Sequence, residues 1–192
     1  MNLLLLADTE APLPSAKDVH VILTLGDLDL GYLRKLPVQY PGTPILSVLG
    51  NHDTYELEAP FVTMHAAYGE LEGVTFAGLN GCLPYKDTQK YGYYDEEITE
   101  ILQQYPTVDV VLSHNSPKGI HDSKADMAHE GYAGLLEYIQ KHKPRYVFHG
   151  HQHKDITTKV GETLVIGVYG AKIINIGKTH KGPAVMPGFD KY

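Results

Sequence analysis

Apolar runs that each stop at a residue of the metal-binding type recur along the chain, and they constrain its fold more than any other feature. The run Tyr146-Val147-Phe148 leads directly into His149-Gly150-His151-Gln152-His153. Earlier runs at 2–7, 19–25, 44–49 and 108–113 stop at Asp8-Thr9-Glu10, Gly26-Asp27, Gly50-Asn51-His52-Asp53 and His114. Continuous apolar runs of this length are typical of strands buried on both faces of an α/β fold. Because ligands bind at the carboxyl ends of such strands, the polar strand ends predict one shared site.

The polar segments match five short motifs in the order in which these occur in one known family. The motifs are D-x-H, G-D-x-x-D, G-N-H-[DE], [ST]-H-x-P and G-H-x-H. On these motifs the chain resembles the calcineurin-like metallophosphoesterases, in particular small single-domain bacterial members with D-x-E in place of D-x-H. Gly-Asn-His-Asp followed by Gly-His-x-His at this separation is highly specific. Two positions depart from the pattern: Glu10 replaces the first histidine, and Asp29 precedes the second carboxylate position, which holds Leu30.

The resemblance implies an α/β fold, a four-layer α/β/β/α sandwich, with a dinuclear metal centre. Two divalent cations about 3.5–4 Å apart supply the nucleophile and the positive charge that phosphoester hydrolysis needs. The family's metal ligands correspond here to Asp8, Glu10, Asp27, Asn51, His114, His151 and His153, with Asp27 as the bridge. His52 corresponds to the family's catalytic acid or phosphate contact, and Asp53 to the residue that orients the ring of His52. The substrate-binding residues correspond to Asn51, His52 and His129.

Some residues keep two interpretations. Glu10 is either a hard oxygen ligand or a solvated loop residue, and its carboxylate favours Mn²⁺ as the metal, with Fe, Mg, Zn and Ni as alternatives. His129 either contacts substrate or packs in its loop, while His149 is a hydrogen-bonded core residue. Asp29 is interpreted as a helix N-cap rather than a ligand. The tyrosines of residues 85–94 either form an aromatic wall beside the site or pack elsewhere.

The predicted elements are strands at 2–7, 19–25, 44–49, 74–79, 108–113 and 145–149, helices at 29–36, 94–105 and 130–142, a hairpin at 156–168 turned at Gly161-Glu162, and a last strand at 171–176. Residues 1–176 are expected to form one domain and 177–192 a C-terminal tail. The apolar run 3–6 is too short to span a membrane.

The charge balance narrows the partners of the chain. Its 192 residues carry a formal charge of −7, which disfavours binding to duplex nucleic acid. A small phosphorylated substrate fits, because bound cations invert the local charge. A single cysteine is consistent with a reducing compartment, and we expect a cytoplasmic protein. The expected function is a metal-dependent phosphodiesterase, with a phosphomonoesterase or a non-catalytic metal-binding scaffold as alternatives. The sequence leaves the oligomeric state open.

Overall fold

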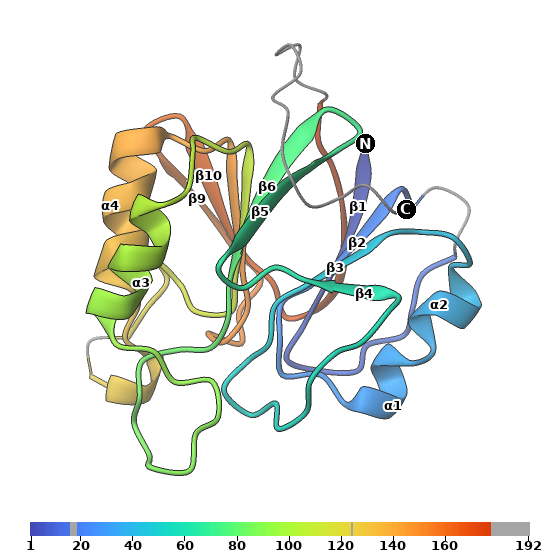
Figure 1. Ribbon diagram of the computed structural model, residues 1–192, viewed down its shortest axis with the longest axis horizontal. Helices are drawn as coiled ribbons and strands as arrows, with labels where there is room; N and C mark the ends of the chain where they lie inside the picture. Colours follow the sequence, from blue (N-terminus) through green and yellow to red (C-terminus); the bar gives the residue numbers. More distant parts are fainter. Residues whose placement is uncertain (16–18, 124, 178–192) are drawn as a thin grey trace.

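Two mixed β-sheets face one another in the computed structural model, which describes residues 1–15, 19–123 and 125–177 (Figure 1). The first sheet has the strand order β11-β1-β2-β3-β4. Its strands are β1 (Asn2–Ala7), β2 (Val21–Thr24), β3 (Ile45–Ser47), β4 (Phe61–Thr63) and β11 (Gly170–Asn175). Strands β1 to β4 are parallel, and β11 pairs antiparallel with β1 from Asn2–Asn175 to Ala7–Gly170.

The second sheet has the strand order β5-β6-β7-β8-β10-β9. Its strands are β5 (Ala67–Leu71), β6 (Val74–Leu79), β7 (Val110–Ser113), β8 (Tyr146–His149), β9 (Ile156–Val160) and β10 (Thr163–Gly167). The four central strands run parallel, and β5 and β9 form antiparallel edges. The carboxyl ends of the parallel strands in both sheets therefore meet at one edge of the molecule.

Helices cover the outer face of each sheet and complete a four-layer α/β/β/α sandwich (Figure 1). Helices α1 (Leu30–Leu33) and α2 (Leu36–Gln39) lie on the first sheet, and α3 (Asp95–Gln103) and α4 (Ala133–His142) on the second. The apolar core has three parts that match these layers. One lies between the sheets around Leu5, Phe76 and Phe148, one under α3 and α4, and one under α1 and α2. The fold expected from the motifs is confirmed.

The helix expected at 29–36, helix α4 and the strands β4 and β5 differ from the expected elements for identifiable reasons. The single helix expected at 29–36 is two short helices, because Pro37 has no N–H to continue the first helix. Helix α4 begins at Ala133 rather than at residue 130, where the carboxylate of Asp95 accepts hydrogen bonds from the N–H groups of Ala133 (3.1 Å) and Gly134 (3.0 Å). Strands β4 and β5 were not predicted. Both are edge strands with mixed, partly exposed side chains, so no apolar run marks them.

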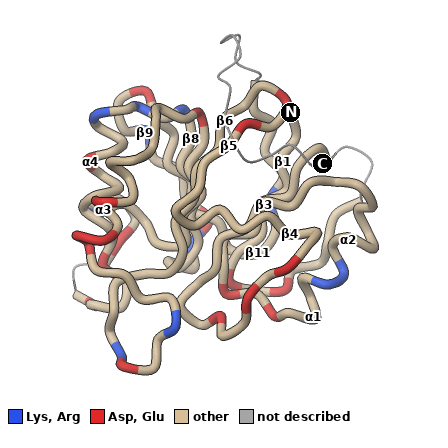
Figure 2. Tube along the Cα trace, in the orientation of Figure 1, with Lys and Arg blue, Asp and Glu red and all other residues tan. Residues whose placement is uncertain are grey.

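Charged residues are unevenly distributed over the face of the molecule seen in Figure 2. In the view of Figure 2, acidic segments gather on α3 and along the loops at the lower edge, and no broad basic face is present. None of the described helices is long and apolar enough to cross a membrane. The expected tail at 177–192 lies, apart from Gly177, outside the described residues.

Candidate metal centre

Backbone hydrogen bonds join the strand ends into one platform. The N–H of Asp8, after β1, donates to the carbonyl of Gly26, after β2, at 3.1 Å. Within the second sheet, the N–H of Gly150 donates to the carbonyl of His114 at 3.1 Å. The N–H of Gly81 donates to the carbonyl of Leu49 at 2.7 Å and so connects the two sheets. The polar residues that follow these strands are thereby held side by side.

Three of the predicted ligands have ligand atoms within 4.8 Å of one another: Asp27, His114 and His151. They follow β2, β7 and β8 and thus come from both sheets. Asn51, after β3, joins them, because its Oδ1 lies 2.9 Å from Nε2 of His114. One carboxylate, one amide oxygen and two imidazoles therefore converge, a donor set that suits a divalent transition-metal ion.

Both ring nitrogens of His114 face oxygen atoms that can accept a hydrogen bond. Its Nδ1 lies 2.7 Å from the carbonyl of Leu25, which can only accept, and its Nε2 lies 2.9 Å from Oδ1 of Asn51 and 3.4 Å from Oδ2 of Asp27. Burial alone would lower the pKa of His114, but the charge and hydrogen bond of Asp27 raise it to about 9. The same pair holds the pKa of Asp27 below its usual range despite burial. The side chains of His114, Asn51 and Asp27 thus aim at one point, where a cation fits in place of a proton.

His151 is held as a neutral ligand. Its Nε2 donates to the carbonyl of Ala128 at 2.6 Å, which leaves the lone pair of Nδ1 for a cation. Burial lowers the pKa of His151 to about 3, so the ring is uncharged at neutral pH. The carbonyl of Ala128 belongs to the long segment after β7, which therefore reaches the site.

Asp8 supplies the clearest sign of a missing positive partner. Its Oδ1 accepts from the N–H of His151 at 3.0 Å, whereas its Oδ2 is buried and has no hydrogen-bond partner. Burial raises the pKa of Asp8 to about 6, partly offset by the nearby charge of His114. A buried carboxylate oxygen without a partner is costly in a folded protein. A bound cation would satisfy it, so the residues present fit the metal centre that the motifs imply.

Four predicted ligands adopt left-handed backbone conformations. The φ angles of Asp8, Asp27, His151 and His153 are 62°, 54°, 64° and 51°. Such angles are uncommon outside glycine and collect at functional sites, where they turn the chain sharply at the end of a strand. This conformation aims side chains from separate strands into one place.

Two motif glycines allow the close approach of these turns. A Cβ atom on Gly50 would lie 2.1 Å from Oδ1 of Asp27, and one on Gly26 would lie 2.4 Å from the backbone nitrogen of Gly50. Gly26 also has a φ angle of 95°. Any side chain at either position would displace Asp27 or the turn that carries Asn51.

The carboxylate of Asp53 bonds to the backbone of two ligand loops. Its Oδ2 accepts from the N–H groups of Asp27 (3.0 Å) and Gly50 (2.7 Å), and none of the hydrogen bonds of the described residues joins it to the ring of His52. It therefore fastens two ligand loops together. The ring of His52 is exposed at the mouth of the site, and its backbone N–H donates to Oδ1 of Asp27 at 2.8 Å.

Glu10 and His153 lie at the periphery of the cluster. The exposed carboxylate of Glu10 accepts from the backbone N–H of Asp29 at 3.2 Å. Asp29 is the N-cap of α1, as expected, and accepts from the N–H of Tyr32 at 3.1 Å. The ring of the exposed His153 lies 5.5 Å from that of Tyr169. Neither Glu10 nor His153 belongs to the group of ligand atoms within 4.8 Å among the described residues.

A match to a family model covers residues 4–155, and that model describes the calcineurin-like phosphoesterases. The chain belongs to this family. A comparison with curated proteins gives no significant match. All five calcineurin-like motifs, together with strands β2 to β8, fall within the matched residues.

Solved structures share the calcineurin-like fold at low identity. TT1561 of Thermus thermophilus has a TM-score of 0.61 and 15% identity, covering 88% of this chain and 89% of that one. Phosphopantetheinyl hydrolase (PptH) of Mycobacterium tuberculosis has a TM-score of 0.60 and 14% identity, with 88% and 89% covered. A dimetal phosphatase of Danio rerio has a TM-score of 0.57 and 11% identity, with 88% and 87% covered. These likenesses establish the fold.

In this calcineurin-like site, two further histidines lie close to the ligands. His129 stacks on His151 with ring centroids 4.8 Å apart, and its Nδ1 lies 2.6 Å from Oδ2 of Asp126. His149 is fully buried, as expected for a core residue. Its Nδ1 donates to the carbonyl of Gly150, and its Nε2 lies 2.8 Å from Nδ1 of His121. His149 thus supports the backbone of the ligand loop from behind.

The tyrosines of residues 85–94 do not act together. Tyr91 is buried and donates to the carbonyl of Tyr55, while the ring of Tyr93 lies against His65 at 4.4 Å. Tyr94 is exposed. Only Tyr85 reaches a predicted ligand, since its hydroxyl accepts from Nδ2 of Asn51 at 2.9 Å. The sequence contained no signal for this contact beyond the general expectation of an aromatic segment.

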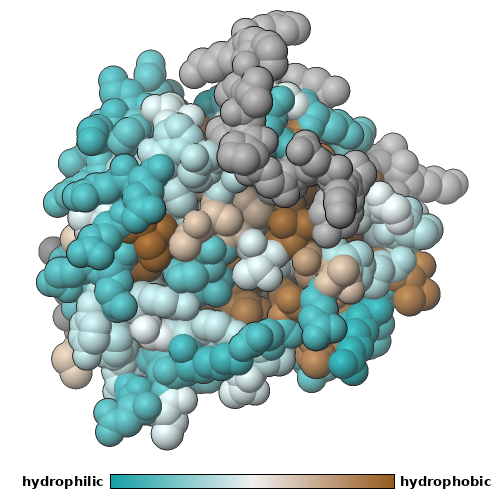
Figure 3. Space-filling model, in the orientation of Figure 1, coloured by the Kyte–Doolittle hydropathy of each residue, from teal (hydrophilic) through white to brown (hydrophobic). Residues whose placement is uncertain are grey.

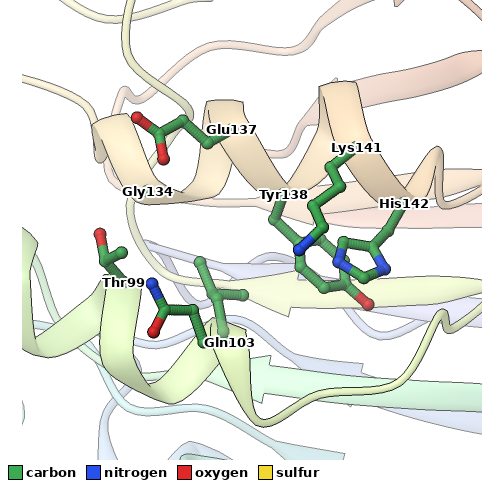
Figure 4. Close-up of a pocket in the computed structure, with 8 residues that line it drawn as sticks. Thr99, Gln103, Gly134, Glu137, Tyr138, Lys141 and His142 are labelled. Carbon is green, nitrogen blue, oxygen red and sulfur yellow. The ribbon is translucent and has the colours of Figure 1, made fainter.

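The calcineurin-like centre opens onto a hollow of about 330 Å³. The hollow is lined by Asp27, Leu28, Asp29, Leu30, His52, Asp53, Thr54 and Tyr55. In the view of Figure 3, the lower edge, where the strand-end loops lie, is mostly hydrophilic. A smaller hollow of about 100 Å³ lies between α3 and α4 and is lined by Thr99, Glu137, Tyr138 and other helix residues (Figure 4). It shares no residue with the ligand cluster.

Proposed function

We propose that the protein is a metal-dependent phosphodiesterase with two divalent cations, of which Mn²⁺ is the first candidate. One observation carries this proposal: Nε2 of His114 faces Oδ1 of Asn51 and Oδ2 of Asp27, next to the Oδ2 of Asp8, which has no hydrogen-bond partner among the described residues. The match to a family of phosphoesterases and the convergence of Asp27, His114 and His151 support the same chemistry.

The proposed ligands divide into two sets that share Asp27. The first set is Asp27, Asn51, His114 and His151, and the second is Asp8, Asp27 and His153, with Glu10 as a further candidate. When bound, the cations would supply a water activated as nucleophile and positive charge beside the transition state. Carboxylate and amide oxygens mixed with imidazoles suit Mn²⁺ better than a softer ion.

His52 is the proposed catalytic acid. Its ring is exposed at the mouth of the site, free of hydrogen bonds within the described part of the chain, and its backbone is held by Asp27. It can therefore protonate the leaving oxygen of a substrate bound over the cluster. Asp53 keeps this turn in place through the N–H groups of Asp27 and Gly50.

The hollow beside the cluster favours a diester over a monoester. Apart from Asp27, whose charge the cations would neutralise, the described residues that line it include Asp29 and Asp53 and no lysine or arginine. A phosphodiester carries one negative charge and a monoester approaches two at neutral pH, so acidic walls repel the monoester more strongly. We place the leaving group of a small phosphodiester in this hollow, and the ring of His129 beside the phosphoryl group on the opposite side.

The deciding experiment compares bis(p-nitrophenyl) phosphate with p-nitrophenyl phosphate in metal-free protein reloaded with Mn²⁺. We expect Mn²⁺-dependent hydrolysis of the diester at the higher kcat/KM and complete loss of activity with EDTA. Asp27→Asn should lose both metal and activity, whereas Asp109→Asn, at the far end of β7, should keep both. Diester hydrolysis that survives exhaustive chelation would refute the metal mechanism. A higher kcat/KM for the monoester would instead identify a phosphomonoesterase.

A further inference from the structure

Among the described residues, Tyr85 is the only one outside the family motifs whose side chain hydrogen-bonds to a predicted ligand of the cluster. Its hydroxyl accepts from Nδ2 of Asn51 at 2.9 Å, and the Oδ1 of that amide faces Nε2 of His114 at 2.9 Å. The contact fixes which end of the amide points at the cluster. Asn51 is 4% exposed, so this orientation is set in a buried site.

The proton of the Tyr85 hydroxyl remains available. A phenol has one proton to donate and two lone pairs that accept. Asn51 uses one lone pair, and no acceptor for the proton is present among residues 1–15, 19–123 and 125–177. The side chain is half-buried at the rim, so this proton can reach a ligand bound over the cluster.

The loop that carries Tyr85 is held in a fixed shape by one side chain. Gln89 accepts from the backbone N–H of Tyr85 at 3.3 Å, and its Nε2 donates to the carbonyls of Leu83 (3.4 Å) and Tyr91 (3.2 Å). The ammonium of Lys86 lies 5.1 Å from the centroid of the Tyr85 ring. The hydroxyl is therefore positioned before any ligand arrives, which is the condition under which a single donor contributes most to catalysis.

We propose that Tyr85 is a catalytic residue that donates a hydrogen bond to a non-bridging oxygen of the phosphoryl group. This inference rests on the proposed phosphoesterase function and adds a residue to it. Phosphoryl oxygens only accept hydrogen bonds, and negative charge on them is stabilised by preorganised donors. A neutral phenol supplies such a donor without adding a charge beside the cations. Through Asn51, the same hydroxyl connects substrate binding to the orientation of a metal ligand.

The test compares Tyr85→Phe with a matched control, Tyr146→Phe. Tyr146 also has a cation over its ring, Arg145 at 5.4 Å, but lies at the opposite end of β8 and its hydroxyl makes no hydrogen bond within the described residues. Three quantities are compared: Mn²⁺ affinity, by calorimetry on metal-free protein; inorganic phosphate affinity, by calorimetry on Mn²⁺-loaded protein; and kcat/KM on bis(p-nitrophenyl) phosphate, also on Mn²⁺-loaded protein. Thermal unfolding verifies that both variants fold.

We expect Tyr85→Phe to keep Mn²⁺ affinity within about threefold, to weaken phosphate binding by about 3–10-fold and to lower kcat/KM by about 10–100-fold. Tyr146→Phe should match the wild type in all three. Phosphate binding and turnover that are unchanged in Tyr85→Phe would overturn the proposal, and so would a loss of Mn²⁺ that accounts for the whole effect.

Phosphate binding separates this proposal from the proposed function. A wild type that binds phosphate but hydrolyses no ester would refute the phosphodiesterase, while a weaker phosphate affinity in Tyr85→Phe would still support the hydrogen bond.

Discussion

Binding of Mn²⁺ should become tighter as pH rises from 6.5 to 8.5, because the cation has to displace the proton of His114. The pKa of that imidazole is raised from 6.5 to about 9 by the charge and hydrogen bond of Asp27, which outweigh burial. At any pH below about 9 the metal-free site therefore holds a proton that a bound cation excludes, and metal ligands bind only when deprotonated.

The magnitude follows from the linkage between proton and metal. Below the raised pKa, each unit of pH changes the apparent association constant about tenfold, so two units give about 100-fold. Burial raises the pKa of Asp8 to about 6, so below pH 6 a cation must displace a second proton. The apparent association constant of Mn²⁺ then depends more steeply on pH. Between pH 6.5 and 8.5 we expect about one proton released per cation that binds to the His114 set.

The raised pKa of His114 also predicts how the stability of the metal-free protein depends on pH. A histidine whose folded pKa is raised contributes stability that is fully present below pH 6.5 and is lost as pH rises through about 9. A shift of this size corresponds to about 3 kcal/mol at most. Metal-free protein should therefore lose stability across this range, and Mn²⁺ should raise Tm more at pH 8.5 than at pH 6.5.

Isothermal titration calorimetry in two buffers of different ionisation enthalpy measures the released proton, and scanning calorimetry measures Tm. His114→Asn should flatten the pH dependence and weaken binding, whereas His142→Gln, on the far end of α4, should behave as wild type. An association constant that is independent of pH between 6.5 and 8.5, without proton release, would refute the arrangement of His114, Asp27 and Asn51 described above.

Four further predictions address individual residues. His52→Ala should keep its metal and slow diester hydrolysis by about 10²–10⁴-fold, measured as kcat beside metal content; loss of metal would assign His52 to the ligands. Because Glu10 bonds to the N–H of Asp29, Glu10→Gln should leave calorimetric Mn²⁺ affinity nearly unchanged, and a large loss would identify a ligand. Gly50→Ala should abolish metal binding by displacing Asp27, and retained affinity would contradict the contact at 2.1 Å. His149→Leu should lower the free energy of unfolding in urea by about 1–3 kcal/mol, since His121 and the Gly150 carbonyl lose their partner; unchanged stability would contradict this.

The buried strands and the convergence of Asp27, His114 and His151 could be predicted because both are marked locally, whereas the four-layer arrangement followed from the resemblance to the calcineurin-like family. Each buried strand is an apolar run, and Asp27, His114 and His151 follow such runs directly. Because the strands of such an α/β fold run parallel, their carboxyl ends lie at the same edge of the sheet. The N-cap at Asp29 was equally local, since its partner is three residues away.

Features that depend on distant partners could not be predicted in this way. Helix α4 begins where Asp95, 38 residues earlier, binds the N–H of Ala133. The hydroxyl of Tyr85 finds Asn51 across 34 residues, and nothing in the loop composition specifies that distance in space. Asp53 was expected to serve its neighbour His52, but three-dimensional packing brings its carboxylate to the backbone of Asp27 instead.

The left-handed backbone of Asp8, Asp27, His151 and His153 gives a way to distinguish related sequences that bind a metal from those that have lost it. Each of these positions would be relaxed by glycine, by about 1 kcal/mol. Selection for stability alone would therefore replace these residues with glycine, and only selection for the cation retains an aspartate or histidine in a strained turn. In descendants of this chain that have abandoned metal chemistry, we expect glycine to appear first at these four positions while the apolar strands before them remain intact.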